Sequence, residues 1–331
     1  MRQHFEILGT GSDLPGPGVP AAEMERRGQL PAGWIAQHTQ VVTRYECALP
    51  ETPSDMARRA IARALEDARL GWSDIDLLID CSTSRHQPIP CNAAILLSRF
   101  RPDSDGVPGM DVQGTCLGFL LGLNVANSLL ADPDGPTRRI LLVASEGAIA
   151  GADWSHPESA TLLSDGAAAV VVGRRPSDPG GYQFRHETWP EYVHECEVIG
   201  GGHRLPVFQY SPERETEFRF RMTGPRLLRI ALRNLPPLVE TLVQESGTPR
   251  EELLCVPHQA SVHGVEAMRR RLKFSAEQFI NRVASLGNMA AASLPLVLDQ
   301  LRREGALAPG RRLLLLGTSA GYSQAGMIFT V

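Results

Sequence analysis

A cysteine stands where a short apolar run ends and a helical pattern begins. Cys116 follows the strand-like residues 109–113 and precedes an apolar helical run over 117–130. A thiol at the start of a helix faces unpaired backbone N–H groups and the positive end of the helix dipole, and both favour the thiolate. Gly114 and Gly118 leave room for another molecule to approach the sulfur. We therefore interpret Cys116 as a nucleophile; the alternative is a small buried apolar side chain.

Two polar residues in the second half of the chain could act with this thiol. His258 follows a predicted strand and precedes a predicted helix, in the kind of loop that carries side chains into a site. Asn288 stands at the start of a further predicted helix. Each has a structural alternative, because a lone histidine is more often structural than catalytic and an asparagine at a helix start is often an N-cap.

A turn of small residues near the end of the chain is a third feature. Ala320 and Gly321 lie in this turn, between two predicted terminal strands. Such a turn can bring backbone N–H groups close to a ligand, and the alternative is a tight hairpin with no such role.

The elements that must position these residues alternate between strands and helices, which is typical of an α/β protein. Helices are predicted over residues 54–70, 92–100, 117–130, 224–244, 262–272 and 289–304, and strands over 76–81, 109–113, 139–144, 167–173, 253–256, 312–317 and 325–331. Residues 174–181 contain two prolines and mark a boundary, so we expect one half over 1–175 and another over 176–331. The segment 182–221 is expected to be irregular and to contain a surface loop or a lid.

Composition narrows the class of protein. The chain has 331 residues, of which 43% are hydrophobic and 21% charged, as in an ordinary globular protein. A net charge of −4 without a long basic run argues against nucleic acid as a partner. No signal-peptide pattern and no run of roughly 18 apolar residues is present, so we expect a cytoplasmic protein that does not contact a membrane. The six cysteines lack CxxC or zinc-ligand spacing, so neither disulfides nor a metal is expected.

Four ordered segments resemble motifs of the β-ketoacyl-acyl-carrier-protein synthase III group of thiolase-fold condensing enzymes. Residues 111–119 (DVQGTCLGF) are similar to the family's D-V-x-x-A-C-x-G-F, residues 163–169 (LSDGAAA) to F-G-D-G-A-G-A, residues 257–261 (PHQAS) to P-H-Q-A-N, and residues 287–295 (GNMAAASLP) to G-N-T-S-A-A-S-x-P. The resemblance covers nearly the whole chain. It implies a five-layered αβαβα fold built from two duplicated halves, the first carrying the cysteine and the second the histidine and asparagine, and a homodimer.

The resemblance also implies a mechanism. Cys116 would attack an acyl thioester while backbone N–H groups of Cys116 and of the Ala320–Gly321 turn stabilise the oxyanion. A second thioester, usually malonyl on an acyl carrier protein, would then lose CO₂ while His258 and Asn288 donate hydrogen bonds to its carbonyl oxygen. The carbanion would attack the acyl-cysteine and give a β-ketoacyl thioester, and no metal or redox cofactor is needed.

Departures from the family pattern fall where the family binds its substrates. Trp34 matches a tryptophan that contacts the adenine of coenzyme A in the family, but His38 and His263 replace two of its arginines. A coenzyme A thioester is therefore less strongly implied as donor than a carrier-bound one. Ile89 stands where the family has the residue that caps the acyl pocket across the dimer, and an aliphatic side chain there would permit a longer or bulkier acyl group.

Basic residues at the end of the helix after His258 resemble the face on which this family docks its acidic carrier protein. They are Arg269, Arg270, Arg271 and Lys273. The alternative is a solvated helix face without a partner.

We therefore predict an acyltransferase that forms a carbon–carbon bond on malonyl- or β-ketoacyl-carrier protein, in fatty-acid-related or polyketide biosynthesis. One alternative is an acyltransferase of the same fold that moves the acyl group to a hydroxyl or amine of a small molecule. The retained Asn288 favours the first hypothesis, because stabilising an enolate is the main use of that amide. Another alternative is a non-catalytic subunit that shapes the cavity of a partner, against which the intact Cys116, His258 and Asn288 speak.

Overall fold

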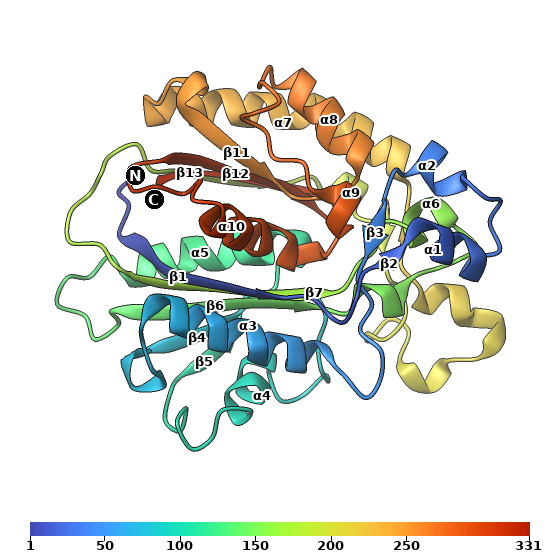
Figure 1. Ribbon diagram of the computed structural model, residues 1–331, viewed down its shortest axis with the longest axis horizontal. Coiled ribbons are helices and arrows are strands. Elements are labelled where there is room, and N and C mark those ends of the chain that lie inside the picture. The colour runs from blue at the N-terminus through green and yellow to red at the C-terminus, as the bar shows by residue number, and fades with distance from the viewer.

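Two β-sheets alternate with three layers of helices, so that each sheet lies between two helical layers. The computed structural model describes residues 1–331, and Figure 1 shows the layers from α7 and α8 through the second sheet, α5 and α10, and the first sheet to α3 and α4. The helices are α1 Ala21–Arg27, α2 Trp34–His38, α3 Pro53–Ala68, α4 Asn92–Ser98, α5 Gly118–Leu129, α6 Pro157–Ala160, α7 Gly224–Ser246, α8 Val262–Arg271, α9 Val283–Leu286 and α10 Ser293–Arg303. The predicted five-layered αβαβα fold is confirmed.

The first sheet has the strand order β1-β7-β6-β4-β5 and the second the order β11-β12-β13-β8. Their strands are β1 Phe5–Asp13, β4 Leu77–Asp80, β5 Gly109–Asp111, β6 Arg139–Glu146, β7 Gly166–Arg174, β8 Gln183–Thr188, β11 Leu253–Pro257, β12 Arg312–Ser319 and β13 Ser323–Thr330. Two small two-stranded sheets pair β2 Val19–Pro20 with β3 Thr43–Arg44 and β9 Cys196–Glu197 with β10 Arg221–Met222. All strands of the first sheet precede residue 175 and all strands of the second follow it; the division into two duplicated halves stays a prediction.

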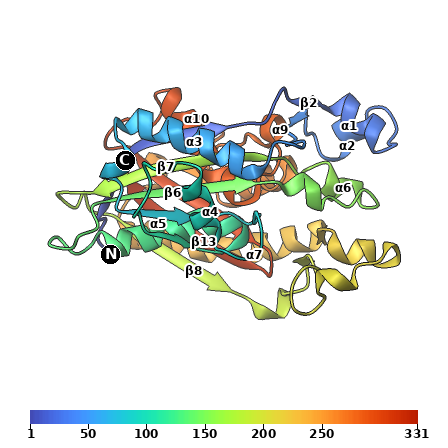
Figure 2. The same cartoon turned by 90° about the horizontal axis from the view of Figure 1, so that it is seen from below.

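The inner strands are buried on both faces. Nearly every residue of β6 and β7 is buried, because helices cover one face of the first sheet and the central layer covers the other. Figure 2 shows the chain from below, with α3 across the outer face of β6 and β7. Strands enclosed in this way need a continuous apolar run, and the run 167–173 provides one.

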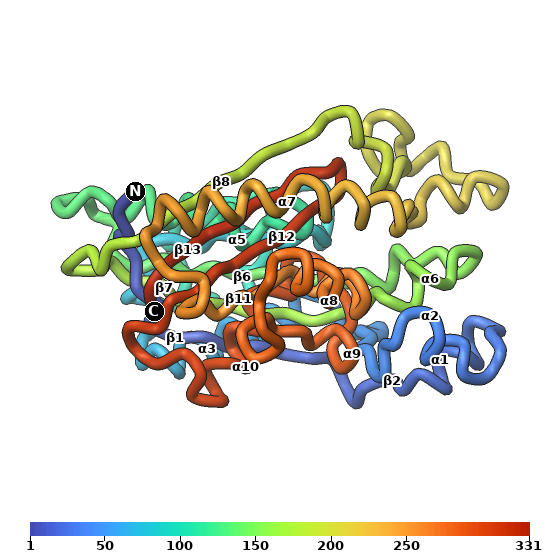
Figure 3. The backbone as a smooth tube through the Cα atoms, turned by 90° about the horizontal axis from the view of Figure 1, so that it is seen from above, coloured from blue at the N-terminus to red at the C-terminus, as the bar shows by residue number.

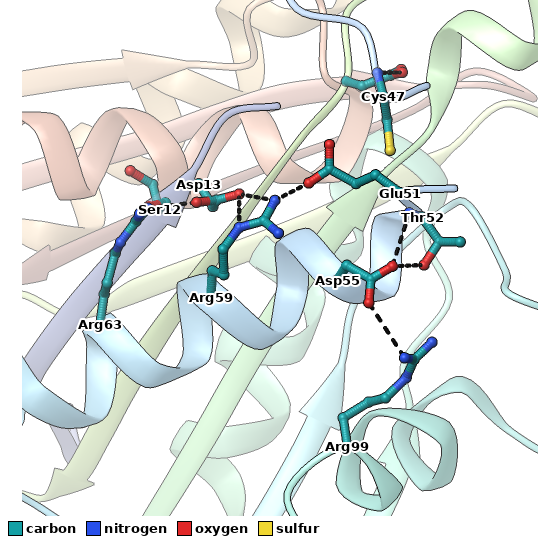
Figure 4. A network of polar contacts seen from close by, with 10 residues as sticks. Ser12, Asp13, Cys47, Glu51, Thr52, Asp55, Arg59, Arg63 and Arg99 are labelled. Atoms are coloured by element: carbon teal, nitrogen blue, oxygen red, sulfur yellow. Dashed lines mark hydrogen bonds and ion pairs between the residues drawn. The ribbon is translucent and has the colours of Figure 1, made fainter. Parts of the chain in front are cut away.

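Helix α3 begins where its sequence predicts. The Asp55 carboxylate accepts hydrogen bonds from the Thr52 backbone N–H at 3.0 Å and from the Thr52 hydroxyl at 2.6 Å. Pro53 occupies the first helical position, where its missing N–H costs no hydrogen bond. Arg99 near the end of α4 also bonds to Asp55, at 3.3 Å, and joins the two outer helices (Figure 4).

Charged contacts tie α3 to the end of β1. Arg59 and Arg63 both bond to the buried Asp13 carboxylate, at 2.8 and 2.7 Å (Figure 4). Two guanidinium groups therefore neutralise the buried Asp13 carboxylate. Arg59 also contacts Glu51. Closer to the middle of β1, glycines let the helix approach: a Cβ on Gly11 would lie 2.4 Å from the Ala60 carbonyl oxygen.

The segment 182–221 is more ordered than a surface loop. It contains β8, which pairs with β13 at the edge of the second sheet, and also β9 and the first residue of β10. The expectation of an irregular loop was wrong for β8, because alternating residues such as Phe184 and Arg185 gain their strand partner only from the end of the chain. No helix of the chain is long and apolar enough to cross a membrane.

The two ends of the chain are joined. The Gln3 side chain donates to the Thr330 carbonyl oxygen at 2.6 Å and accepts from the Thr330 backbone N–H at 2.9 Å. Figure 1 shows both termini together at one end of the molecule, and Figure 3 shows α1, α2 and α6 at the opposite end.

The close approach of α3 to β1 predicts that Gly11→Ala destabilises the fold. The added methyl group would meet the backbone of Ala60 and Ala64, which cannot move without shifting the helix. We expect the free energy of unfolding to fall by about 1–3 kcal/mol, measured by urea denaturation. Gly202→Ala is the matched control, since nothing lies within 4 Å of its Cβ position; an equal loss in both variants would contradict the packing argument.

Candidate active site

One cavity of about 640 Å³ brings the predicted catalytic residues together. Cys116 reaches it from the 3₁₀ turn before α5, His258 from the end of β11 and Asn288 from the connection between α9 and α10. Ala320, from the turn between β12 and β13, and Trp34, from α2, also line it. These five residues come from distant segments of the sequence and line the same cavity.

Other predicted site residues lie outside this cavity. Gly321 is next to Ala320 but does not line the cavity. Ile89 is 83% exposed on a loop of exposed residues, and the four basic residues Arg269, Arg270, Arg271 and Lys273 lie at the far end of α8. Conversely, the cavity walls include residues that the sequence did not indicate, among them His156, Phe220 and one face of α7 from Gly224 to Leu235.

Tight backbone packing holds the Cys116 turn between the two sheets. Thr115 has a φ of 48°, a left-handed conformation that few residues with side chains adopt. A Cβ on Gly118 would lie 2.1 Å from the Cys81 carbonyl oxygen, at the end of β4. On the opposite side, a Cβ on Gly317 of β12 would lie 2.9 Å from Leu117 and 3.2 Å from the His258 side chain. The approach at Gly118 requires glycine because it is made to backbone, whereas Gly317 packs against side chains.

The resting thiol is not the thiolate that the helix position suggested. Burial raises the pKa of Cys116 above its ordinary value, and the nearby Cys196 and Glu146 raise it further. The backbone N–H groups of Cys116 and Ala320 lower this pKa, but by less. The expectation was wrong because α5 itself begins only at Gly118, so the burial of the site outweighs the helix terminus.

A buried carboxylate that the sequence did not indicate lies close to the nucleophile. Glu146, at the end of β6, accepts backbone hydrogen bonds from Thr83 at 2.7 Å and Ser84 at 2.9 Å, and one from the Ser84 hydroxyl at 2.8 Å. Burial raises the pKa of Glu146 to about 7, although these three donors oppose the shift. Its main structural effect is to fix the loop that follows β4.

His258 is a neutral, buried imidazole. Only 6% of the residue is exposed, and its backbone N–H donates to the Leu316 carbonyl oxygen at 2.7 Å. Burial lowers the pKa of His258 to about 4, and its Nδ1 has no hydrogen-bond partner. The adjacent Gln259 fixes the loop, because its amide donates to the Pro257 carbonyl oxygen at 2.6 Å and accepts from the Arg282 backbone N–H at 2.7 Å.

Asn288 combines a local backbone contact with a place in the cavity wall. Its side-chain oxygen accepts from the Ala290 backbone N–H at 3.0 Å, but the residue is not the N-cap of a helix, since Met289 precedes the 3₁₀ turn 290–292 and Ala292 precedes α10. Its amide nitrogen donates to the Ala260 carbonyl oxygen at 3.3 Å, so it is tied to the loop that carries His258. The backbone of Asn288 forms a β-bridge with Leu163, and this bridge fixes the position of Asn288 in the cavity wall.

The indole of Trp34 is stacked on an imidazole at the cavity wall. The Trp34 and His38 ring centroids are 4.2 Å apart and the rings are nearly parallel, at 9°. His38 Nδ1 also lies 2.8 Å from the Trp34 carbonyl oxygen. One face of the indole is therefore covered by a residue of the chain.

The basic end of α8 carries less free charge than its sequence suggests. Arg269 and Arg270 both pair with Glu266, at 2.8 and 2.7 Å, and these hydrogen bonds lower the pKa of Glu266 to about 2. Arg271 donates to the Leu232 carbonyl oxygen of α7 at 3.3 Å. Lys273, just beyond the helix, is exposed.

Comparison with known proteins places this geometry in a family. The family model of 3-oxoacyl-[acyl-carrier-protein] synthase III matches residues 110–189. The model of the C-terminal region of the same enzyme matches residues 243–331. The chain therefore belongs to the β-ketoacyl-acyl-carrier-protein synthase III family of condensing enzymes, and the resemblance drawn from the four segments is confirmed.

Individual relatives agree. β-Ketoacyl-[acyl-carrier-protein] synthase III of Thiobacillus denitrificans is 30% identical over 327 residues, which cover 97% of both chains. That of Neisseria gonorrhoeae is 29% identical and covers 98% of this chain and 99% of its own. Among solved structures, the priming β-ketosynthase of the R1128 polyketide pathway is 26% identical with a TM-score of 0.88, covering 100% of this chain and 97% of its own. The synthase III of Thermus thermophilus is 26% identical with a TM-score of 0.86, covering 98% of each chain.

The burial of His258 predicts that its imidazole stays neutral down to about pH 5. Ring nitrogen shifts followed by NMR should show no protonation above that pH, with His258→Asn used to assign the signal. Because the unfolded imidazole takes up a proton near pH 6.5 and the folded one does not, this group should lower the free energy of unfolding as the pH falls from 6.5 to 4. Protonation with a midpoint above pH 6 would contradict the prediction.

Proposed function

We propose that Cys116 accepts an acyl group from a thioester and that the enzyme joins this group to malonyl- or β-ketoacyl-carrier protein to form a longer β-ketoacyl thioester. The observation that carries the proposal is the single cavity shared by Cys116, a neutral His258 and Asn288. A nucleophile and two neutral hydrogen-bond donors are what acyl transfer followed by enolate formation requires.

In the first half-reaction, the Cys116 sulfur forms a bond to the acyl carbonyl carbon and the donor's C–S bond breaks. The thiol proton leaves with the donor's sulfur, so that a free thiol and an acyl-cysteine result. Backbone N–H groups of Cys116 and Ala320 stabilise the tetrahedral oxyanion, and they already lower the pKa of the thiol in the resting site. Because that pKa is raised overall by burial, the proton moves only when the donor is bound.

In the second half-reaction, decarboxylation leaves an electron pair on the α-carbon of the malonyl thioester. His258 and Asn288 donate hydrogen bonds to the thioester oxygen, on which the enolate's negative charge develops. The carbanion attacks the acyl-cysteine, and Cys116 leaves and regains a proton. A neutral imidazole suits this role, since it donates from one nitrogen without placing a full positive charge in a buried site.

The partners of the reaction follow from the same assignment. We place the enzyme in the cytoplasm as a homodimer in which Ile89, exposed here and absent from the chain's own cavity, caps the acyl pocket of the second subunit. Trp34 contacts the arm of the thioester substrate. The carrier protein docks on the end of α8, at Arg269, Arg270, Arg271 and Lys273.

Intact-protein mass spectrometry tests the two half-reactions separately. Wild-type protein should gain the mass of the acyl group from an acyl thioester and lose it, as β-ketoacyl product, on addition of malonyl-carrier protein. Cys116→Ala should gain no mass, whereas Cys91→Ala, at an exposed cysteine outside the cavity, should behave as wild type. Asn288→Ala should acylate but discharge about a hundredfold more slowly.

The outcomes separate the competing functions. An acyl-enzyme that malonyl-carrier protein does not discharge, but that a small hydroxyl or amine compound does, would replace condensation by simple acyl transfer. Absence of acylation from every thioester would contradict the catalytic assignment and point to a subunit that supports an active partner.

A further inference from the structure

The cavity that holds Cys116 contains no permanent positive charge. Among all the side chains that line it, none is lysine or arginine, and the one carboxylate is Glu158. Its other titratable groups, besides the cysteines and Tyr322, are four imidazoles, those of His38, His156, His258 and His263. The wall is otherwise made of apolar side chains and small polar groups.

Three of these imidazoles lie on elements away from the catalytic loop. His38 ends α2 and is stacked on Trp34. His156 precedes α6, and its Nδ1 lies 3.1 Å from the Asp153 carboxylate and 3.0 Å from the Ser155 hydroxyl. His263 is exposed in the first turn of α8.

Two other groups that could contact a nucleotide are partly engaged within the chain. The N-terminal N–H of Gly264 in α8 donates to the Ser261 hydroxyl oxygen at 3.0 Å. One face of the Trp34 indole is covered by His38 and is closed to a nucleobase. The Ser261 hydroxyl therefore takes up one N–H of α8, and His38 leaves one face of the indole for a ligand.

Net positive charge lies instead on the outer surfaces of α7 and α8, although Arg269 and Arg270 share Glu266 and Arg226 pairs with Glu195. The arginines of α7 (Arg226, Arg229 and Arg233) and the basic residues at the end of α8 (Arg269, Arg270, Arg271 and Lys273) are all absent from the cavity lining. The two helices lie against each other, joined by the bond from Arg271 to Leu232 (Figure 3). A negatively charged partner is thus attracted to the outside of the cavity rather than into it.

Donor thioesters differ in how much charge they bring. Coenzyme A carries a pyrophosphate and a 3′-phosphate, and a phosphate monoester alone bears about −1.5 to −2 charges at pH 7. Proteins usually bind such groups with arginine or lysine. A carrier-bound phosphopantetheine has one phosphodiester, and the rest of its arm is uncharged.

We propose that the acyl donor is a thioester on the phosphopantetheine arm of a carrier protein, and that coenzyme A thioesters are poor donors because the cavity has no permanent cation for the nucleotide phosphates. The inference rests on the proposed acyl transfer to Cys116 and names the donor for that step. The uncharged arm enters past apolar residues such as Phe220 and Leu228, while the acidic carrier stays on the basic outer face of α7 and α8.

A binding experiment tests, without any acyl transfer, whether the cavity binds the nucleotide phosphates of coenzyme A. Isothermal titration at pH 8 compares pantetheine, 4′-phosphopantetheine and coenzyme A on the intact protein. We expect coenzyme A to bind no more than about threefold more tightly than 4′-phosphopantetheine. A preference for coenzyme A of about tenfold or more would overturn the inference, because the nucleotide would then have a binding site.

Acylation rates test the donor itself. With the same acyl group, kcat/KM for formation of the acyl-enzyme should be at least about tenfold higher from acyl-carrier protein than from acyl-coenzyme A. Equal rates, or faster acylation by acyl-coenzyme A, would overturn the donor assignment and leave the proposed condensation intact. Acylation by neither donor would overturn both. Acyl-phosphopantetheine, included as a third donor, separates the contribution of the arm from that of the carrier.

Adding positive charge to the cavity wall tests whether missing cations limit coenzyme A binding. The double variant His38→Arg/His263→Arg places two permanent cations at the cavity, and we expect it to tighten coenzyme A binding at least about tenfold relative to 4′-phosphopantetheine. His186→Arg is the matched control, since His186 is exposed on β8 and does not line the cavity. An unchanged ratio in the double variant would show that missing cations are not what limits coenzyme A.

Discussion

The geometry of the site depends on one constraint, the close approach of the Cys116 turn to strands of both sheets. Gly118 lies against the backbone of Cys81 on one side, and Leu117 fits against Gly317 on the other. The same Gly317 lies beside the His258 side chain, so the nucleophile and the imidazole are positioned by a shared contact. A side chain at Gly118 would clash with the Cys81 carbonyl group and displace the turn that carries the nucleophile.

Burial then decides how the groups in this cavity are charged. It lowers the pKa of His258 and raises those of Cys116 and Glu146, so at neutral pH the site holds a neutral imidazole and a protonated thiol rather than an ion pair. Negative charge on the reacting atoms therefore develops during the reaction, close to backbone N–H groups and neutral donors. The rest of the cavity lining likewise has few charged groups, because it contains histidines but no arginine or lysine.

The sequence predicted most of this arrangement, and its failures have physical causes. Cys116, His258, Asn288 and Ala320 were associated through their resemblance to the family's motifs, and α3 was predicted because Pro53 marks its start and Gly71 its end. Strand β1 was missed, because its glycines become buried only through contact with α3. The cavity face of α7 was missed because helical periodicity shows that a face is apolar but not whether it meets a core or a cavity. The thiolate expectation failed because the burial of Cys116 is set by distant segments.

The link between Gln3 and Thr330 has a consequence for how the chain is made. These two residues are separated by 327 positions, so the segment around Gln3 completes these hydrogen bonds only after the segment around Thr330 has been made. Strand β1 likewise must wait for β7, more than 150 residues later in the sequence, before its ladder can form. Contacts of such long range slow folding and leave strand edges unpaired in the meantime. Strand β1 therefore stays unpaired until β7 has been made, which leaves its hydrogen-bonding edge exposed during synthesis.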